Sequence, residues 1–198
     1  MPLVRTYLAL GDSMSIDDYT GIHGGGAVNQ FYRMLGEGWR LDDRTQDGCR
    51  IPETPRDGHG ELITLTIGGN DLLWNREYYL REGLESFAAA HLALLEQIRR
   101  RNPAALFIVG DIYHPARPLS PIEAAALAAA NELIRRNVKL VGGRLARICD
   151  AFRGHEAACL CYEIEPTLMG ATAIAKLFFE LYDKAEERSP RDPESSWR

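Results

Sequence analysis

The sequence predicts a three-layer α/β/α fold, with a central, mostly parallel, five-stranded sheet between two layers of helices. Three observations lead to this prediction. Short, almost continuously apolar segments have the character of strands that are buried on both faces. Longer segments with an apolar stripe at helical spacing lie between them. Strands that alternate with such helices are joined by crossovers, which make neighbouring strands parallel.

Five segments are expected to form the strands, and glycine or proline marks several of their boundaries. In chain order they are residues 4–10 (VRTYLAL), WRLDDRT near residue 40, Leu62–Ile67, AALFIVGDIYH from Ala104, and ARICDAF from Ala146. WRLDDRT is the least apolar of the five. Because the strands are parallel, the polar groups that follow them are expected beyond the carboxyl edge of the sheet.

Helical patterns occupy the intervening segments. Apolar residues recur at intervals of three and four over residues 84–98, and His91 lies on the same stripe. The next helix has the most complete start signal in the chain: Ser120 is the N-cap, Pro121 follows it, and Glu123 completes a capping box. Two further helices are expected around AVNQFYRML and from about Thr167 through LMGATAIAKLFFELYDKAEER.

The composition is that of an ordinary globular protein. The 198 residues have a net charge of −5 and 26% charged side chains, so nothing favours nucleic acid as a partner. No segment approaches the ~20 apolar residues of a membrane span, and no secretory cleavage site follows the N-terminus. We therefore expect a cytoplasmic protein that acts on a small molecule without a cofactor. One domain is expected over residues 1–188, followed by a flexible tail over 189–198.

The motif Gly11-Asp12-Ser13 directly follows the first expected strand. A serine at such a turn can expose its hydroxyl at the edge of the sheet, beside backbone N–H groups that stabilise an oxyanion. Serine and aspartate are also common in turns and at helix caps, which is the alternative explanation. Two other strand ends carry groups that suit the catalytic interpretation, namely Gly48 and the segment Gly68-Gly69-Asn70-Asp71.

In this order, the motifs resemble those of the SGNH, or GDSL, hydrolase superfamily. The resemblance extends from residue 4 to about residue 180. It implies a flavodoxin-like fold and hydrolysis of a carboxylic ester or an acylated sugar. It also implies that Ser13 is the nucleophile, and that the Ser13 N–H, Gly48 and the side chain of Asn70 stabilise the oxyanion.

The last block of the family differs in this chain. Where the family has Asp-x-x-His-Pro, this chain has YEIEP, so that Tyr162 occupies the aspartate position and Glu165 the histidine position. Pro166 and the later Gly170 stay in register. A serine nucleophile needs a neighbouring base, and Glu165 is the candidate if burial raises its pKa above the ordinary value of about 4.3.

A histidine from elsewhere in the chain is the alternative base. His114 follows the strand from Ala104, which places it on the same edge of the sheet as Ser13, and His155 follows the last expected strand. His91 is expected in the core, because it lies on the apolar stripe of a helix. The four cysteines form no Cys-x-x-Cys pair and are expected as buried free thiols.

Three functional hypotheses follow. The first is a serine ester hydrolase of the SGNH type with an atypical base. The second is a catalytically degenerate protein of the same fold that binds a small acyl or carbohydrate ligand, because both residues of the dyad are replaced. The third is a metal-assisted hydrolase with a hard cation such as Mg²⁺. The oxygen ligands for such a cation would come from Asp12, Asp17, Asp18, Asn70 and Glu165.

Overall fold

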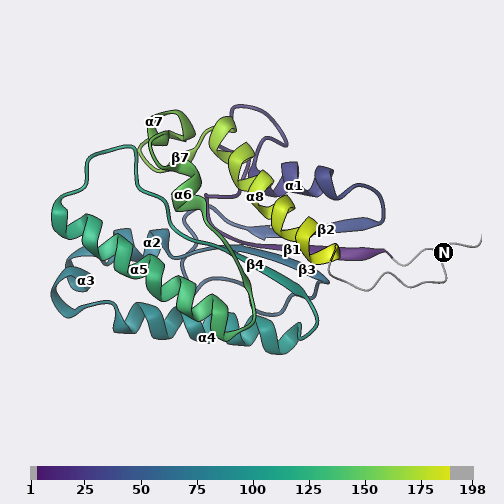
Figure 1. The fold of residues 1–198 in the computed structure, drawn as a ribbon, viewed down its shortest axis with the longest axis horizontal. Helices are drawn as coiled ribbons and strands as arrows, with labels where there is room; N and C mark the ends of the chain where they lie inside the picture. Colours follow the sequence, from purple (N-terminus) through teal and green to yellow (C-terminus); the bar gives the residue numbers. More distant parts are fainter. Residues whose placement is uncertain (1–3, 188–198) are drawn as a thin grey trace, which may run out of the picture.

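The computed structural model describes residues 4–187, and a parallel five-stranded sheet runs through them (Figure 1). The strand order is β2-β1-β3-β4-β5, and every neighbouring pair is parallel. The strands are β1 (Arg5–Gly11), β2 (Trp39–Thr45), β3 (Leu62–Thr66), β4 (Leu106–Gly110) and β5 (Arg144–Ala146). This is the flavodoxin-like order, so that the predicted fold class is confirmed.

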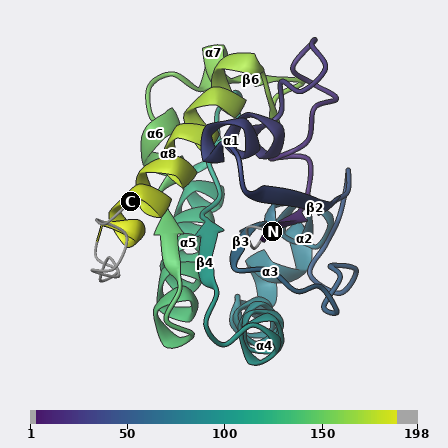
Figure 2. The same ribbon diagram turned by 90° about the vertical axis from the view of Figure 1, so that its right-hand side faces the viewer.

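Helices cover both faces of the sheet, as Figures 1 and 2 show. They are α1 (Ala27–Leu35), α2 (Gly69–Trp74), α3 (Arg76–Glu82), α4 (Glu85–Arg101), α5 (Pro121–Leu140), α6 (Ile148–Phe152), α7 (Glu156–Cys159) and α8 (Leu168–Glu186). Helices α1 and α8 pack together on one face, and α4 and α5 on the other. A short antiparallel hairpin of β6 (Leu160–Cys161) and β7 (Glu165–Pro166) precedes α8.

The two faces of the sheet form two separate hydrophobic cores. In β1, Tyr7 and Ala9 belong to the core with α1 and α8, whereas Leu8 and Leu10 belong to the core with α4 and α5. This alternation follows from the period of two along a strand. All four side chains are buried, which explains why β1 is a continuous apolar run in the sequence. The strand ends that carry the site are thereby held from both faces.

The prediction for the last strand is wrong in position. The segment from Ala146 was expected to form a strand, but β5 ends at Ala146 and residues 148–152 form α6. The side chain of Asp111, which follows β4, accepts a hydrogen bond of 2.8 Å from the backbone N–H of Cys149. This contact from a distant residue satisfies a backbone donor at the start of the helix, and no local pattern indicates it.

Of the other predicted helices and strands, some are confirmed, and several short elements of the structure were not predicted. The strand WRLDDRT forms β2, and the capping box of Ser120 and Glu123 begins α5. Sequence analysis missed α2, α3 and α7, together with the β6–β7 hairpin.

Cys49 and Cys159 are buried free thiols as expected, whereas Cys149 and Cys161 are only partly buried. The boundary at residue 188 and the predicted tail lie outside the described residues. Within residues 4–187, no helix is long and apolar enough to cross a membrane.

Gly11 ends β1 in a conformation that only glycine adopts without strain. Its φ is +133°, and a Cβ atom at this position would overlap the backbone oxygen of Thr66 on β3. We expect Gly11→Ala to destabilise the protein by about 3 kcal/mol or more, because backbone strain and steric overlap add. Gly142→Ala, just after α5, is the matched control: its φ is +64° with no atom within 4 Å, so only a backbone strain of about 1 kcal/mol is expected. Urea denaturation measures both losses, and equal losses would contradict the steric explanation.

Candidate active site

The Gly11-Asp12-Ser13 turn lies at the carboxyl end of β1. The backbone N–H of Asp12 donates a hydrogen bond of 2.9 Å to the carbonyl of Thr66, which ends the neighbouring strand β3. The hydroxyl of Ser15 bonds to the hydroxyl of Thr66 at 2.9 Å. These contacts attach the turn to the centre of the sheet. Ser13 itself is 7% exposed, so that its hydroxyl is sheltered from bulk water.

Two hydrogen bonds bring the loop of Gly48 to the start of α2. The carboxylate of Asp71 accepts the backbone N–H of Ile51 at 3.1 Å, and Asn70 Nδ2 donates to the carbonyl of Cys49 at 3.2 Å. Asn70 and Asp71 are adjacent residues in the first turn of α2, which follows β3. The second and third sequence motifs are therefore neighbours in space, although 20 positions separate Ile51 from Asp71.

Several hydrogen-bond donors in these three motifs are available to a ligand. Within residues 4–187, no group accepts a hydrogen bond from the backbone N–H of Ser13 or of Gly48. The Asn70 amide carries two hydrogens, and the contact with Cys49 uses one of them. Unpaired N–H groups of this kind are the donors from which oxyanion holes are built.

The β6–β7 hairpin carries Glu165, and contacts from the loop after β4 hold it in place. The hydroxyl of Tyr113 donates to the carbonyl of Ile164 at 2.5 Å. The backbone N–H of Ala116 donates to the carbonyl of Glu163 at 2.7 Å. Both acceptors are in the two residues that precede Glu165, so the position of its backbone is well defined.

The carboxylate of Glu165 lies beside Ser13. Burial raises the pKa of Glu165, and the negative charge of Asp47 raises it further, while hydrogen bonding with the Ser13 hydroxyl partly offsets these effects. Glu165 is 9% exposed, and no described group bonds to its Oε2 atom. A buried carboxylate oxygen without a partner is costly, and it is a ready acceptor for a proton.

Asp12 is a second buried carboxyl group in the site. Burial raises its pKa from 3.8 to about 8, and the charge of Glu165 contributes to this rise. Its Oδ1 atom accepts the backbone N–H of Met14 at 3.2 Å. Asp12 is therefore mainly protonated at neutral pH and adds little negative charge to the site. An anion that develops near Ser13 is consequently not repelled by its neighbour in the chain.

Tyr162, which the sequence resemblance aligns with the family's aspartate, does not line the cavity that Ser13 lines. Its side chain is 81% exposed, and it contacts Tyr19 edge to face, with ring centroids 6.3 Å apart. Tyr162 and Glu163 have φ angles of 47° and 69°, in the left-handed region that side chains other than glycine seldom adopt. The hairpin turn holds these two strained residues, and only Ile164 separates them from Glu165.

His114 lies in a different environment from Ser13. It is partly buried after β4, and both His114 and His155 are close to the carboxylate of Glu156. The backbone N–H of His114 points to the thiol of Cys149. Neither histidine lines the cavity that Ser13 lines. The structure therefore places Ser13 and Asn70 on one cavity, with Glu165 beside Ser13 and the loop of Gly48 bonded to Asn70, and it leaves His114 outside this group.

The other three histidines are also remote from this group. His91 is fully buried in α4, where it stacks on Phe87 and bonds to Asn137, as expected for a core histidine. Burial lowers its pKa to about 4, which keeps the ring neutral. His23 is exposed beside Asp17, and the ring of His59 is close to the guanidinium of Arg101.

The proposed cation ligands do not form a common centre. Asp17 accepts backbone N–H bonds from Gly24 at 2.6 Å and Gly26 at 2.7 Å, and its Oδ1 atom also accepts the amide of Asn29. Its carboxylate thus shapes the loop before α1. In the described part of the chain, no three or more His, Cys, Asp or Glu side chains are arranged to hold a metal ion.

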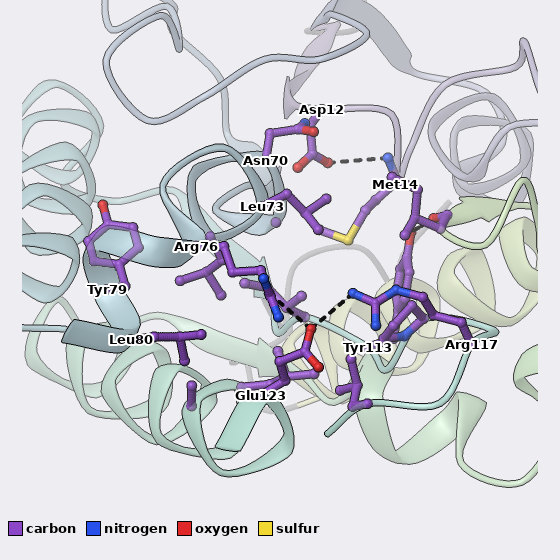
Figure 3. A pocket seen from close by; sticks show the side chains of 18 of the residues that line it. Asp12, Met14, Asn70, Leu73, Arg76, Tyr79, Leu80, Tyr113, Arg117 and Glu123 are labelled. Carbon is purple, nitrogen blue, oxygen red and sulfur yellow. Dashed lines mark hydrogen bonds and ion pairs between the residues drawn. The ribbon is translucent and has the colours of Figure 1, made fainter. Parts of the chain in front are cut away.

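A cavity opens from Ser13 into the space between α2, α3 and α5 (Figure 3). Its volume is about 130 Å³. Asp12, Met14 and Asn70 lie towards one end, and Leu80 and Glu123 lie at the opposite end of the view. Apolar side chains form most of the wall: Leu72, Leu73, Leu84, Ile112, Leu119, Leu127 and Ile164.

Three charged side chains cross the outer part of this cavity. Glu123, at the start of α5, accepts a hydrogen bond of 3.0 Å from Arg76 of α3 and one of 3.2 Å from Arg117 (Figure 3). Arg117 also pairs with Glu163 at 3.5 Å. Hydrogen bonds with Ser120, followed by those charges, lower the pKa of Glu123 to about 2. These groups are paired with one another, so they present few free polar atoms to the cavity.

Comparison with known proteins finds similarity at the level of structure. No protein-family model matches the chain, and no curated protein matches it. The lipase Lip_vut3 from a goat rumen metagenome superposes with a TM-score of 0.76 at 20% identity, covering 89% of this chain and 97% of the lipase. A protein assigned as a GDSL-like lipase, from Parabacteroides merdae, gives 0.74 at 15% identity, with 91% and 96% covered. The acetylxylan esterase Axe2 from Geobacillus stearothermophilus gives 0.71 at 14% identity, with 91% and 96% covered.

The chain has the SGNH hydrolase fold. On this fold, the three sequence motifs with Ser13, Gly48 and Asn70 occupy the carboxyl edge of the parallel sheet, where ligands bind in open α/β sheets. At these identities the likeness establishes the fold, and the chemistry has to be argued from the residues themselves.

Sequence analysis missed the residues that shape the cavity of this SGNH fold. Arg76 and Leu80 come from α3, and Glu123 was recognised only as part of a helix cap. A signal for α2 and α3 was present in the segment LLWNREYYLREGL, where apolar residues recur at helical spacing. Glycines and asparagines flank these two short helices, and the segment was therefore not assigned to any element.

Proposed function

We propose that this protein is a serine ester hydrolase in which Glu165 is the general base. The observation that carries the proposal is the buried Glu165 carboxylate beside the Ser13 hydroxyl, with an oxygen that has no other described partner. A carboxylate whose pKa is raised by burial is a stronger base than an exposed one. The general structural likeness to lipases and esterases supports the same reaction class.

The first half of the reaction acylates Ser13. Glu165 accepts the hydroxyl proton while Oγ attacks the carbonyl carbon of the ester. The resulting oxyanion accepts hydrogen bonds from the N–H groups of Ser13 and Gly48 and from the Asn70 amide. Glu165 then returns the proton to the leaving oxygen, the carbon–oxygen bond breaks, and an alcohol departs.

The second half restores the enzyme. A water molecule attacks the acyl carbon while Glu165 takes one of its protons, and the same donors stabilise the second oxyanion. Collapse of this intermediate releases the acid, and the proton returns from Glu165 to Ser13 Oγ. Each proton that Glu165 takes is given back, so one water molecule is consumed for each ester cleaved.

The hairpin supplies the orientation that the family's aspartate gives to its histidine. A carboxylate has a shorter side chain than a histidine paired with an aspartate, and its direction depends mainly on its backbone. The bonds of Tyr113 and Ala116 to the two residues before Glu165 hold that backbone. The proposal therefore assigns no role in catalysis to Tyr162, which is exposed.

A fluorophosphonate probe tests the nucleophile directly. The probe forms a covalent bond with an activated serine, so we expect labelling of the wild-type protein and no labelling of Ser13→Ala, measured by intact mass. Ser15→Ala is the matched control, because the Ser15 hydroxyl is bonded to Thr66 and should leave labelling intact. Equal labelling of wild type and Ser13→Ala would refute a covalent mechanism at Ser13.

The alternative function is binding of a small acyl or carbohydrate ligand without hydrolysis. The observation in its favour is that Tyr162 replaces the family's aspartate and points to solvent, so no side chain supports the base. A protein that binds substrate-like ligands but is neither labelled by the probe nor active on esters would have this function.

A further inference from the structure

The cavity beside Ser13 has the chemistry of a site for hydrocarbon. Apolar side chains, leucine and isoleucine above all, make most of its wall, and the three charged groups across it are hydrogen-bonded to one another. A sugar placed there would leave most of its hydroxyl groups without partners, and each such buried group is costly. An apolar chain needs no hydrogen-bond partners, and its transfer from water to the cavity is favourable in free energy.

The size of the cavity indicates how long that chain is. Its volume of about 130 Å³ is similar to the ~150 Å³ of apolar protein cavities that stay dry and bind benzene. Benzene has six carbons, so a chain of about this size fills the space. An acetyl group would occupy only the part beside Ser13 and leave the far end near Leu80 empty.

The position of Glu165 shows which part of an ester enters the cavity. In the proposed reaction, Glu165 protonates the leaving oxygen, so the alcohol leaves on the side of Ser13 where Glu165 lies. Glu165 is not among the residues that line the cavity, although its neighbour Ile164 is. The cavity therefore extends from Ser13 on the side away from the leaving group, which is the side of the acyl chain.

We propose that this cavity binds the acyl chain of the substrate, and that the enzyme prefers unbranched acyl groups of about six carbons over acetyl groups. This assignment rests on the proposed function of Ser13 and Glu165. Ala126 of α5 is a specificity-determining residue in this arrangement, because it lines the cavity with a small side chain. A larger residue at this position shortens the acyl chain that fits.

The test is a series of p-nitrophenyl esters from acetate to laurate. Each buried methylene is worth about a fourfold gain in kcat/KM, so hexanoate, with four more methylenes, should exceed acetate by about 250-fold. Ala126→Trp should remove most of this gain and keep activity on acetate. Ala128→Trp is the matched control, since Ala128 is exposed on the opposite side of the same helix and should keep the wild-type profile.

A binding measurement keeps the two proposals separable. Calorimetry with hexanamide and acetamide on the wild-type protein measures binding to the cavity independently of catalysis. This measurement remains possible if the Ala126→Trp variant does not fold. Ester hydrolysis that is fastest for acetate would overturn the acyl assignment and leave the hydrolase standing. Preferential binding of hexanamide without any ester hydrolysis would overturn the hydrolase and leave the cavity assignment. A protein that shows no ester hydrolysis and no binding of hexanamide would overturn both proposals.

Discussion

Replacement of Glu165 by glutamine is expected to lower kcat/KM for an ester substrate by about 1,000-fold. Glutamine has the same shape and cannot accept the Ser13 proton, and a general base contributes about 10² to 10⁴ to the rate. The pH profile gives a second measurement. Since the ionised carboxylate is the active form, the rate of the wild-type enzyme rises with pH through the pKa of Glu165.

Burial raises this pKa, so the acid limb of the profile lies above the ordinary glutamate value of 4.5. The Glu165→Gln variant should lack this limb. Glu163→Gln is the matched control: it makes the same substitution in the same hairpin, at an exposed side chain that pairs with Arg117. A Glu165→Gln variant within tenfold of wild type, with an unchanged acid limb, would exclude Glu165 as the base.

Replacement of Asn70 by alanine is expected to lower kcat by 100-fold or more with little change in KM. Loss of one side-chain donor to an oxyanion costs about 3 kcal/mol of transition-state stabilisation, and the donor contributes less to binding of the uncharged ester. The variant also loses the bond to the carbonyl of Cys49, so its thermal stability should be measured alongside.

Asn75→Ala separates the catalytic effect from a structural one. Asn75 lies at the other end of the same short helix, where its side chain donates to the carbonyl of Asp71 at 3.0 Å. It loses one comparable hydrogen bond, but it has no contact with Ser13. If both alanine variants lower kcat to the same extent, Asn70 acts only by holding α2 in place.

The chemistry of the site depends on which carboxyl groups are charged. The two buried carboxyl groups beside Ser13 differ in function because their environments differ. Asp12 is fully enclosed, and its pKa of about 8 keeps it neutral at pH 7. Glu165 is less deeply buried, and hydrogen bonding with the Ser13 hydroxyl partly offsets the rise of its pKa that burial causes. Enzymes give two carboxyl groups different functions by placing them in unlike surroundings.

The sequence predicted correctly those elements whose structure depends on interactions between residues close together in the chain. The apolar run of β1 requires burial on both faces, and the capping box of Ser120 and Glu123 satisfies the first N–H groups of α5 by itself. The order of the motifs around Ser13, Gly48 and Asn70 was sufficient to predict the fold. In the strand and the cap, and within each of these motifs, the residues that determine the structure are adjacent in the chain.

The sequence by itself determined the α/β/α architecture and the candidate nucleophile, because strand periodicity and glycine turns are local properties. Only the tertiary structure decided which group faces Ser13. Glu165 is 152 positions away, and contacts of Tyr113 and Ala116 with its hairpin set its place, while His114 on a neighbouring loop is turned towards Glu156. The raised pKa of Glu165 has the same origin, because burial depends on packing of segments that are distant in the chain.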